Sequence, residues 1–213
     1  MKTDMLTGLA GRDGMRETLG RHMSGAEGVA LATLDLDNFL SVNQEFGHDT
    51  GDHVLRTVAD LLQSDTQNSG GTAFRLSGDE FAAVLPGLTL EQAFLQMEVF
   101  RKTVETAVER FALPDTRRVT VTVGVAQFPR DARDVPGLTR AAEAALASAK
   151  EGGRNAVALP PNEDMVMKSC YYPAAAVRKL KTLSDKLGRK ESVLLREALT
   201  DLIAKYDVPT PAG

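Results

Sequence analysis

A short acidic turn between two predicted strands constrains the fold of this chain more than any other feature of its sequence. Residues 72–76 and 81–85 are strand-like, and Ser77-Gly78-Asp79-Glu80 between them has the composition of a hairpin turn. Such a turn carries the carboxyl groups of Asp79 and Glu80 to the tip of a hairpin. Taken alone, two acids at a tip are compatible with a solvated turn as well as with a cation site.

Another acidic position lies at the end of a strand that the sequence predicts to be buried. Residues 28–36 form a mostly apolar run that ends on Asp35-Leu36. In a central sheet, the end of this strand can lie beside the hairpin tip, so that Asp35 and Asp79 converge. Two converging carboxylates are hard oxygen ligands suited to Mg²⁺.

The other elements predict an α+β domain with helices packed on a sheet. Their order is strand, two helices, two strands, helix and strand, which gives the mostly antiparallel sheet of polymerase-palm and nucleotide-cyclase domains. The helices are expected over residues 13–23, 38–46, 52–62, 89–110 and 139–150. Besides the strands already given, strands are expected over 119–127 and 157–159.

Four more stretches form a pattern with the acidic turn, in order and at compatible spacing. They are Asp4-Met5-Leu6-Thr7-Gly8-Leu9, then Asp35-Leu36-Asp37-Asn38-Phe39, then Asn43 through Gly47-His48 to Gly51-Asp52, and Ala149-Lys150 with Gly153-Arg154-Asn155. With Arg75-Leu76-Ser77-Gly78-Asp79-Glu80-Phe81, they resemble the GGDEF family of diguanylate cyclases over roughly residues 1–160. The resemblance implies condensation of two GTP molecules into cyclic di-GMP and two pyrophosphates.

The resemblance also implies a metal site for nucleotidyl transfer. Asp35, Leu36 and Asp79 would hold Mg²⁺ or Mn²⁺, with Glu80 as a further ligand or orienting group. Such ions neutralise the triphosphate, lower the pKa of the attacking 3′-hydroxyl and stabilise charge on the reacting phosphorus. Asp35, Asp79 and Glu80 are the expected catalytic residues.

The phosphate contacts follow from the same resemblance. Lys150 and Arg154 would grip the β- and γ-phosphates, although a Lys and an Arg at a helix C-terminus also suit the helix dipole. Backbone amides around Asn38 and Phe39, at a strand-to-helix junction, would donate to phosphate. Arg75 would support the signature loop.

The base contacts complete the expected substrate-binding set. Asn43 and Asp52 would hydrogen-bond the guanine edge, because a carboxylate accepts from guanine N1 and N2 and adenine offers no such pair of donors. His48 would have a structural or ribose-side role, with a surface or capping histidine as the alternative. Ser77 and Gly78 would line the substrate in the signature turn.

The chain departs from the family pattern at several positions. Ser77 stands for the first glycine of the signature, Leu40 for a common lysine near the phosphates, Gln44 for a common aspartate and Gly11 for a common asparagine. The stretch Asn68-Ser69-Gly70-Gly71 stands where the family has the Arg-x-x-Asp of its product-inhibition site. We therefore expect no strong feedback inhibition through that segment.

The last part of the chain has a different pattern. An extended segment from Met165 to Tyr172 ends at Pro173, and helices are expected over 174–187 and from Ser192 to about Tyr206. Their apolar positions are Val177, Leu180, Leu183, Leu187, Leu195, Leu199 and Leu202. This segment resembles the ribbon-helix-helix family of DNA-binding proteins. The expected divisions are residues 1–160, a linker over 161–164, the ribbon-helix-helix unit over 165–207 and a tail over 208–213.

The second resemblance implies a homodimer that binds double-stranded DNA. Two copies intertwine, their strands pair as a ribbon in the major groove, and the N-termini of the second helices contact phosphates. The expected DNA contacts are Lys168, Ser169, Tyr171, Arg189, Lys190 and Ser192. The register of the ribbon stays open, since neither the face with Met165 and Met167 nor the face with Val166 and Lys168 is clearly apolar. A module for dimerisation alone, with a solvated basic face, is the alternative.

Charge and composition bound these hypotheses. Of 25 basic and 29 acidic residues, nine basic and seven acidic ones lie in 161–213, so the net charge of −4 divides into −6 before that segment and +2 within it. The single cysteine, Cys170, excludes an internal disulfide and suits a reducing compartment. No apolar run approaches the ~18 residues that cross a bilayer, and no signal-peptide pattern opens the chain. We therefore expect a cytoplasmic protein with no membrane segment and no sensor domain before residue 4.

Two hypotheses for function remain open at this point. The first is a dimeric diguanylate cyclase whose ribbon-helix-helix unit dimerises it and targets it to DNA or regulates it through DNA. The alternative is a DNA-binding transcriptional regulator whose first domain senses GTP or cyclic di-GMP with little or no turnover.

Overall fold

The computed structural model describes residues 3–25, 28–114, 116–160, 172–187 and 191–206. The chain divides into two compact units, residues 1–165 and 166–213. Within the described residues, no helix is long and apolar enough to cross a membrane. The helices are α1 (Arg12–Met23), α2 (Phe39–Phe46), α3 (His48–Asn68), α4 (Leu90–Thr106), the 3₁₀ turn η1 (Val108–Phe111), α5 (Val135–Glu151), α6 (Ala174–Leu187) and α7 (Glu191–Tyr206). The strands are β1 (Val29–Leu36), β2 (Thr72–Ser77), β3 (Glu80–Pro86), β4 (Val121–Phe128) and β5 (Val157–Ala158).

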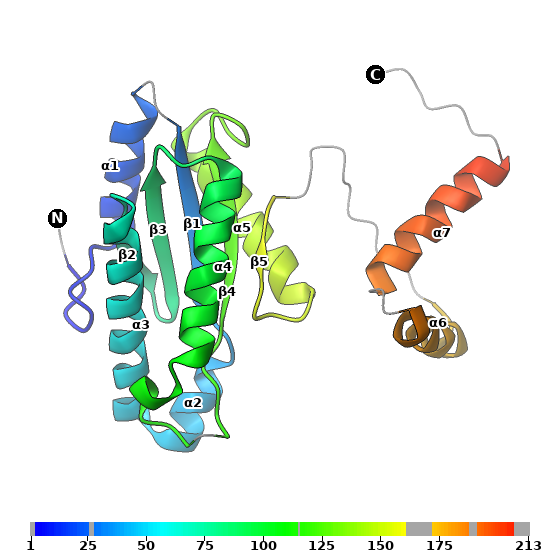
Figure 1. Cartoon of the computed structure of the whole chain (residues 1–213), viewed down its shortest axis with the longest axis horizontal. Coiled ribbons are helices and arrows are strands. Elements are labelled where there is room, and N and C mark those ends of the chain that lie inside the picture. Colours follow the sequence, from blue (N-terminus) through cyan, green and yellow to red (C-terminus); the bar gives the residue numbers. More distant parts are fainter. Residues whose placement is uncertain (1–2, 26–27, 115, 161–171, 188–190, 207–213) are drawn as a thin grey trace. The chain divides into compact units, whose positions relative to one another are not determined.

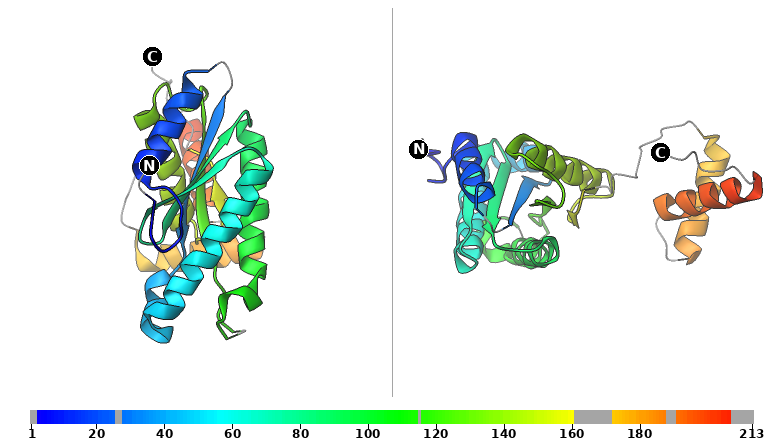
Figure 2. Two further views of the ribbon diagram at one scale, coloured as in Figure 1. Left: turned by 90° about the vertical axis from the view of Figure 1, so that its left-hand side faces the viewer. Right: turned by 90° about the horizontal axis from the view of Figure 1, so that it is seen from above.

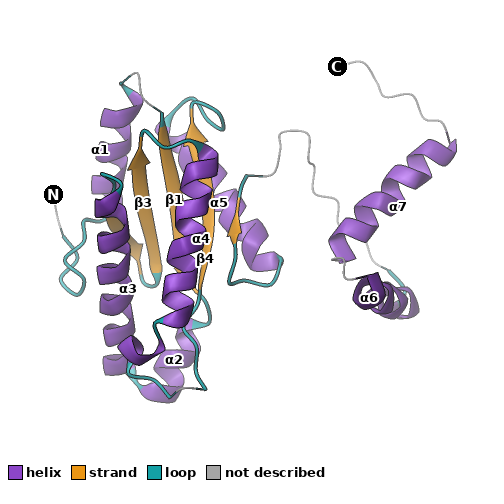
Figure 3. Ribbon diagram, in the orientation of Figure 1, coloured by secondary structure: helices purple, strands orange, loops and turns teal. Residues whose placement is uncertain are grey.

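In the first unit, the described strands form one sheet in the order β2-β3-β1-β4-β5 (Figures 1 and 3). β1 is central and pairs antiparallel with both β3 and β4, and β5 pairs parallel with β4. β1 is apolar at nearly every position because helices cover both of its faces. The sequence predicts a mostly antiparallel, palm-like sheet flanked by helices. The structure confirms the palm-like fold and shows a mixed sheet, in which the β4–β5 pair is parallel.

Alternate residues of β1 belong to two separate cores. Ala30, Ala32, Leu34 and Leu36 pack with α3 and α4, whereas Val29 and Leu31 pack with α1 and α5. The view from above shows this sheet between the two pairs of helices (Figure 2, right). Asp35 has the parity of Val29 and Leu31, so it lies on the α1–α5 side of the sheet.

The predicted helices and strands of the first unit are confirmed, but several of their ends lie elsewhere. α3 begins four residues before the expected Asp52 and continues to Asn68, where buried Thr66 bonds back to the Leu62 carbonyl. The helix expected over 89–110 breaks at Ala107 into α4 and η1. α5 starts at Val135 because Asp134 caps it by accepting from the Gly137 amide at 2.6 Å.

Gly124 allows α5 to lie directly on the sheet. A methyl group at this position would overlap the backbone of Ala142 and Leu146 in α5. The close approach packs Leu138 and Ala142 against the sheet.

The second unit is described over α6 and α7. Leu194 is buried, and Leu180 is half-buried. The other apolar positions of the two predicted faces whose exposure the structure gives are exposed, namely Val177, Leu183, Leu187, Leu195, Leu199 and Leu202, by 37–56%. The expected ribbon, from Met165 to Tyr171, lies outside the described residues.

We expect Gly124→Ala to lower the free energy of unfolding by about 3 kcal/mol, because the added methyl group forces α5 away from β4. Gly20→Ala is the matched control, since a side chain at Gly20 in α1 meets no atom within 4 Å. That control should leave stability unchanged or raise it. Urea unfolding of both variants measures the difference, and equal stabilities would contradict the account of Gly124.

Candidate active site

The end of β1 and the β2–β3 turn meet at one edge of the sheet. Asp35 is paired with Glu80 across the β1–β3 ladder, and the Leu36 amide donates to the Asp79 carbonyl at 3.3 Å. Gly78 turns the chain with a φ of 44°, a left-handed conformation that glycine adopts without strain. Asp35 and Asp79, 44 positions apart in sequence, are thereby brought together.

Arg75 holds the turn in place. Its guanidinium donates to the Gly78 carbonyl from Nη2 at 2.7 Å and from Nε at 3.1 Å, and to Asp4 Oδ1 at 2.8 Å. Burial raises the pKa of Asp4, but hydrogen bonds from Thr7 and Arg75 outweigh it and leave that pKa below its usual value. An ionised Asp4 therefore anchors the arginine that fixes the signature turn.

Glu80 has partners of its own. Its Oε2 accepts from the Ser77 hydroxyl at 2.8 Å and pairs with Arg12 of α1 at 3.4 Å. The serine that replaces the first signature glycine thus contributes a hydrogen bond within the turn. The glutamate ties α1 to the signature, which suits the orienting role.

Lys150 at the C-terminal end of α5 reaches the β1 carboxylate. Its Nζ lies 2.7 Å from Asp35 Oδ2, and both side chains are largely shielded from solvent. Burial raises the pKa of Asp35, Lys150 opposes this, and the charges of Asp79 and Asp37 raise it further. Three carboxylates therefore crowd one edge of the sheet, where positive charge is favourable.

This donor set fits a divalent cation shared with phosphate. Within the described residues, no cluster of three or more His, Cys, Asp or Glu side chains could hold a metal ion by itself. Asp35 and Asp79 offer carboxylates, and Leu36 could offer only its carbonyl oxygen. Mg²⁺ in nucleotide sites commonly takes one or two carboxylates together with substrate phosphates, so the residues present fit that pattern.

The expected base contacts come from α2 and α3. The Asn43 carboxamide occupies the space beside Gly51 that a side chain at 51 would fill, with the Phe39 ring next to it. Asp52 is the next residue along α3, and its Oδ2 forms a long ion pair with Arg56 Nη2 at 3.9 Å. His48 is exposed at the first residue of α3, and Asn38 has a left-handed φ of 56° just before α2.

The comparison with known proteins agrees with this geometry. Residues 1–156 match the family described as "Diguanylate cyclase, GGDEF domain". The chain belongs to the GGDEF family.

Relatives and solved structures support the assignment. The chain is 33% identical to diguanylate cyclase A of Treponema denticola over 64% of this chain and 36% of that protein. It is 35% identical to the cyclic di-GMP phosphodiesterase NbdA of Pseudomonas aeruginosa over 71% of this chain and 20% of that protein. The chain therefore spans well under half the length of these relatives. The GGDEF domain of DgcB from Caulobacter crescentus, solved with c-di-GMP, superposes with a TM-score of 0.63 at 30% identity and covers 73% of this chain and 94% of that one.

Within the GGDEF domain, sequence reasoning missed a buried acid, Asp37. Its carboxylate accepts from the hydroxyls of Thr120 and Thr122 and from the Asn155 amide. The sequence shows only that Asp37 lies two residues after Asp35, just past the end of β1, which is the spacing of residues on one face of a strand. Its partners are more than 80 positions away in sequence, so the pattern around Asp37 could not identify them.

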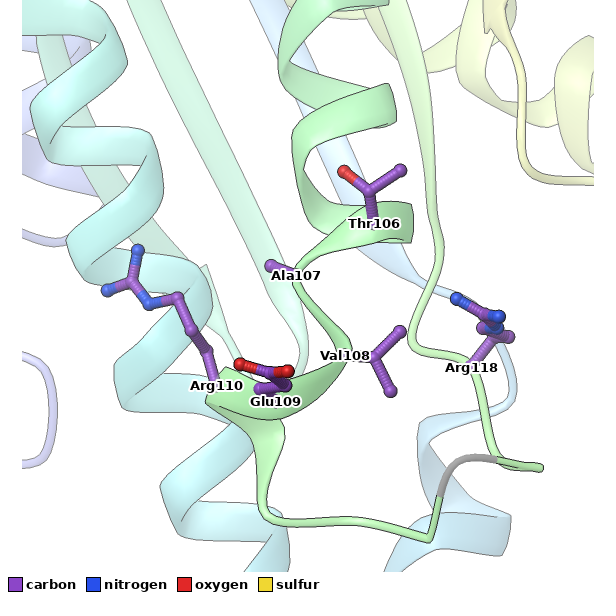
Figure 4. A pocket seen from close by; sticks show the side chains of 6 residues that line it. All are labelled: Thr106, Ala107, Val108, Glu109, Arg110 and Arg118. Carbon is purple, nitrogen blue, oxygen red and sulfur yellow. The ribbon is translucent and has the colours of Figure 1, made fainter.

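A separate hollow of about 420 Å³ lies at the far end of α4 (Figure 4). It is lined by Thr106, Ala107, Val108, Glu109, Arg110 and Arg118. None of these is an expected site residue, and the hollow is separate from the acidic edge of the sheet, where Asp35 and Asp79 lie.

The expected DNA contacts fall almost entirely outside the described residues. Lys168, Ser169, Tyr171, Arg189 and Lys190 are not described. Ser192 is exposed in the first turn of α7. The DNA contacts stay a prediction.

Glu105 should stabilise the fold only while it is ionised. Its hydrogen bond with Lys102, followed by that with Asn155, lowers its pKa from 4.5 to about 2. A lowered pKa in the folded state means that the contribution to stability is complete above pH 4.5 and is lost as the pH falls towards 2. Glu105→Gln should therefore be less stable than the wild type at neutral pH, with a gap that narrows in acid.

Urea unfolding of the wild type and Glu105→Gln at neutral pH and at about pH 3 measures that gap. Glu17→Gln is the control, since the Glu17 side chain is exposed and has no hydrogen bond or ion pair with any described residue. A gap that is constant with pH would contradict the assignment.

Proposed function

We propose that this chain is a diguanylate cyclase that condenses two GTP into cyclic di-GMP and two pyrophosphates. The observation that carries the proposal is the convergence of Asp35, Asp79 and Lys150 at one edge of the sheet. Acids at the end of a central strand, beside a fixed turn and a lysine, are what a metal–triphosphate substrate requires. Membership of the GGDEF family supports the same conclusion.

The proposed metal and phosphate contacts come from different residues. Asp35 and Asp79, with the Leu36 carbonyl, would hold Mg²⁺ or Mn²⁺, which when bound neutralises the triphosphate and lowers the pKa of the 3′-hydroxyl. Lys150 and Arg154 would bind the β- and γ-phosphates, and the Asn38 and Phe39 amides would bind phosphate oxygens.

Guanine recognition falls to the helices beside this edge. Asn43 would bond the base, and the Asp52 carboxylate would accept from N1 and N2, which selects GTP over ATP. His48 would lie on the ribose side or cap α3.

Each chain carries one such half-site, so the reaction needs two copies. In each half-reaction, the 3′-hydroxyl of one GTP loses its proton and its oxygen bonds to the α-phosphorus of the other GTP. The bond from that phosphorus to the oxygen bridging the α- and β-phosphates breaks, and the β- and γ-phosphates leave as pyrophosphate. A unit that brings two copies together raises the local concentration of the second half-site.

The helices α6 and α7 are our candidate for that unit. Apolar positions that the sequence assigns to a core are exposed in the single chain, including Leu183, Leu199 and Leu202 at 45–56%. An exposed apolar surface of this kind marks an interaction site. We propose that a second copy covers it as in ribbon-helix-helix proteins, and that the basic segment 166–196 binds double-stranded DNA.

The alternative, a DNA-binding regulator with an inactive nucleotide-sensing domain, is not favoured. The residues expected to bind the metal and the phosphates are all present. Leu40, which stands where the family commonly has a lysine, is 69% exposed, and Lys150 still pairs with Asp35.

The proposed activity is tested by incubating the full chain with GTP and Mg²⁺ and separating nucleotides by chromatography. We expect cyclic di-GMP from the wild type and at least about a 1,000-fold lower rate from Asp79→Ala, because a metal ligand is lost. Asp131→Asn, at the opposite end of β4, is the control and should keep wild-type activity. GTP binding without product from the wild type would favour the nucleotide-sensing alternative.

The proposed dimer is tested by Leu199→Lys. A charge in an apolar interface should raise the dissociation constant of the dimer by about 100-fold or more. Sedimentation velocity across a concentration series measures it. Leu95→Lys is the matched control, because Leu95 is a leucine of similar exposure, 63% against 56% for Leu199, on α4 of the GGDEF domain. If Leu199→Lys and Leu95→Lys both sediment with the same mass distribution as the wild type, the result would argue against α7 as the interface.

A further inference from the structure

The buried carboxylate of Asp37 has no role in the chemistry proposed above, although it lies two residues from Asp35. Its side chain follows the last residue of β1 and is 9% exposed. Its backbone amide donates to the Thr120 carbonyl at 2.9 Å, which extends the pairing of β1 with β4 by one step. No ion pair links Asp37 to any residue that the structure describes.

Instead, three neutral donors satisfy this carboxylate. The Thr122 hydroxyl donates to Oδ1 at 2.6 Å, and the Thr120 hydroxyl and the Asn155 amide donate to Oδ2 at 2.8 and 3.0 Å. Burial of a charge is unfavourable unless the charge is hydrogen-bonded. Loss of any of the three donors would therefore be costly, and the carboxylate keeps all three in place. Asp37 thereby connects the ends of β1 and β4 to the turn after α5.

That turn is unusual in its backbone. Arg154 and Asn155 both have left-handed φ values, 62° and 45°, and Asn155 is of a residue type that tolerates this conformation better than arginine does. The Arg154 amide donates to the Ala149 carbonyl at 3.1 Å. A left-handed arginine persists only where its surroundings impose the conformation.

Asn155 is held from its other side by α4. Its Nδ2 donates to Glu105 Oε1 at 3.1 Å, and its Oδ1 accepts from Arg101 Nη1 at 2.9 Å. The residue next to Arg154 is therefore fixed by its main chain to Asp37 and by its side chain to Glu105 and Arg101. The guanidinium of Arg154 itself is exposed and bonds to no other residue that the structure describes.

We propose that Asp37 is a positioning residue that fixes, through Asn155, where Arg154 presents its guanidinium to the phosphates. This inference rests on the proposed function, since it assumes that Arg154 binds the nucleotide's phosphates. It gives the second aspartate of the Asp35-Leu36-Asp37-Asn38-Phe39 stretch a role in the geometry of the turn after α5. The side-chain partners of Asp37 that the structure describes are Thr120, Thr122 and Asn155, and none of them is an expected guanine contact on α2 or α3.

Asp37→Asn is the primary test, because an amide keeps the size of the side chain but cannot accept from all three donors. The probes are GMP, which lacks β- and γ-phosphates, and the α,β-methylene analogue of GTP, which cannot release pyrophosphate. Titration calorimetry of the full chain with Mg²⁺ should show the analogue bound about tenfold or more weakly, with GMP affinity unchanged. In turnover, KM for GTP should rise more than kcat falls.

Asp131→Asn is the matched control. Asp131 Oδ2 also accepts a backbone amide, from Gln127 at 2.8 Å, but at the other end of β4. It should leave both affinities as in the wild type. Thr122→Val supplies a second variant should Asp37→Asn fail to fold, because it removes a donor to Asp37 and an acceptor for the Asn155 amide while it keeps the side-chain shape.

A double-mutant comparison shows whether Asp37 acts through Arg154. Arg154→Ala should weaken binding of the analogue. The double variant, Arg154→Ala with Asp37→Asn, should bind the analogue less than about twofold more weakly than Arg154→Ala alone. Additive losses, or equal losses for GMP and the analogue, would overturn the inference.

If the wild type binds the analogue and Asp37→Asn binds it equally well, the inference fails alone. If the wild type binds neither nucleotide, the proposed function fails and the inference with it.

Discussion

The pairing of β1 with two antiparallel neighbours is the constraint on which the site depends. β1 is buried on both faces, and its register against β3 and β4 is continuous from Val29 to Asp35. A shift by one residue would move every apolar side chain to the wrong face, so the register is strongly specified. Because the register is fixed, Asp35 must lie opposite Glu80 on one side and Thr122 on the other.

The same constraint explains why charged groups gather where the apolar strand ends. Asp35 is partly shielded from water and near other acids, which is unfavourable for its charge, and Lys150 offsets this from α5. Lys150 reaches it because Gly124 lets α5 lie on β4. The left-handed Arg154 and Asn155 follow directly, so local backbone preference is overridden at the position where the proposed phosphate contacts lie.

Much of the fold could be predicted from the sequence because its signals are local. The apolar run of β1, the Ser77–Glu80 turn and the periodicity of α6 identified those elements, whereas helix ends such as that of α4 depend on caps and packing. The GGDEF motif residues were predicted as a set, and the structure brings Asp35, Asp79 and Lys150 together. Asp37, Glu105 and the tie to Asn155 were not predicted, since hydrogen bonds between residues 50–118 positions apart leave no pattern in one sequence.

The most direct test of the account is the position of a bound metal ion. Crystals of the full chain with Mn²⁺ and the α,β-methylene analogue of GTP would show the ion by its anomalous scattering. The account predicts the ion between the carboxylates of Asp35 and Asp79, with the β- and γ-phosphates directed to Lys150 and Arg154. An ion bound away from Asp35, or phosphates directed away from the end of α5, would contradict it.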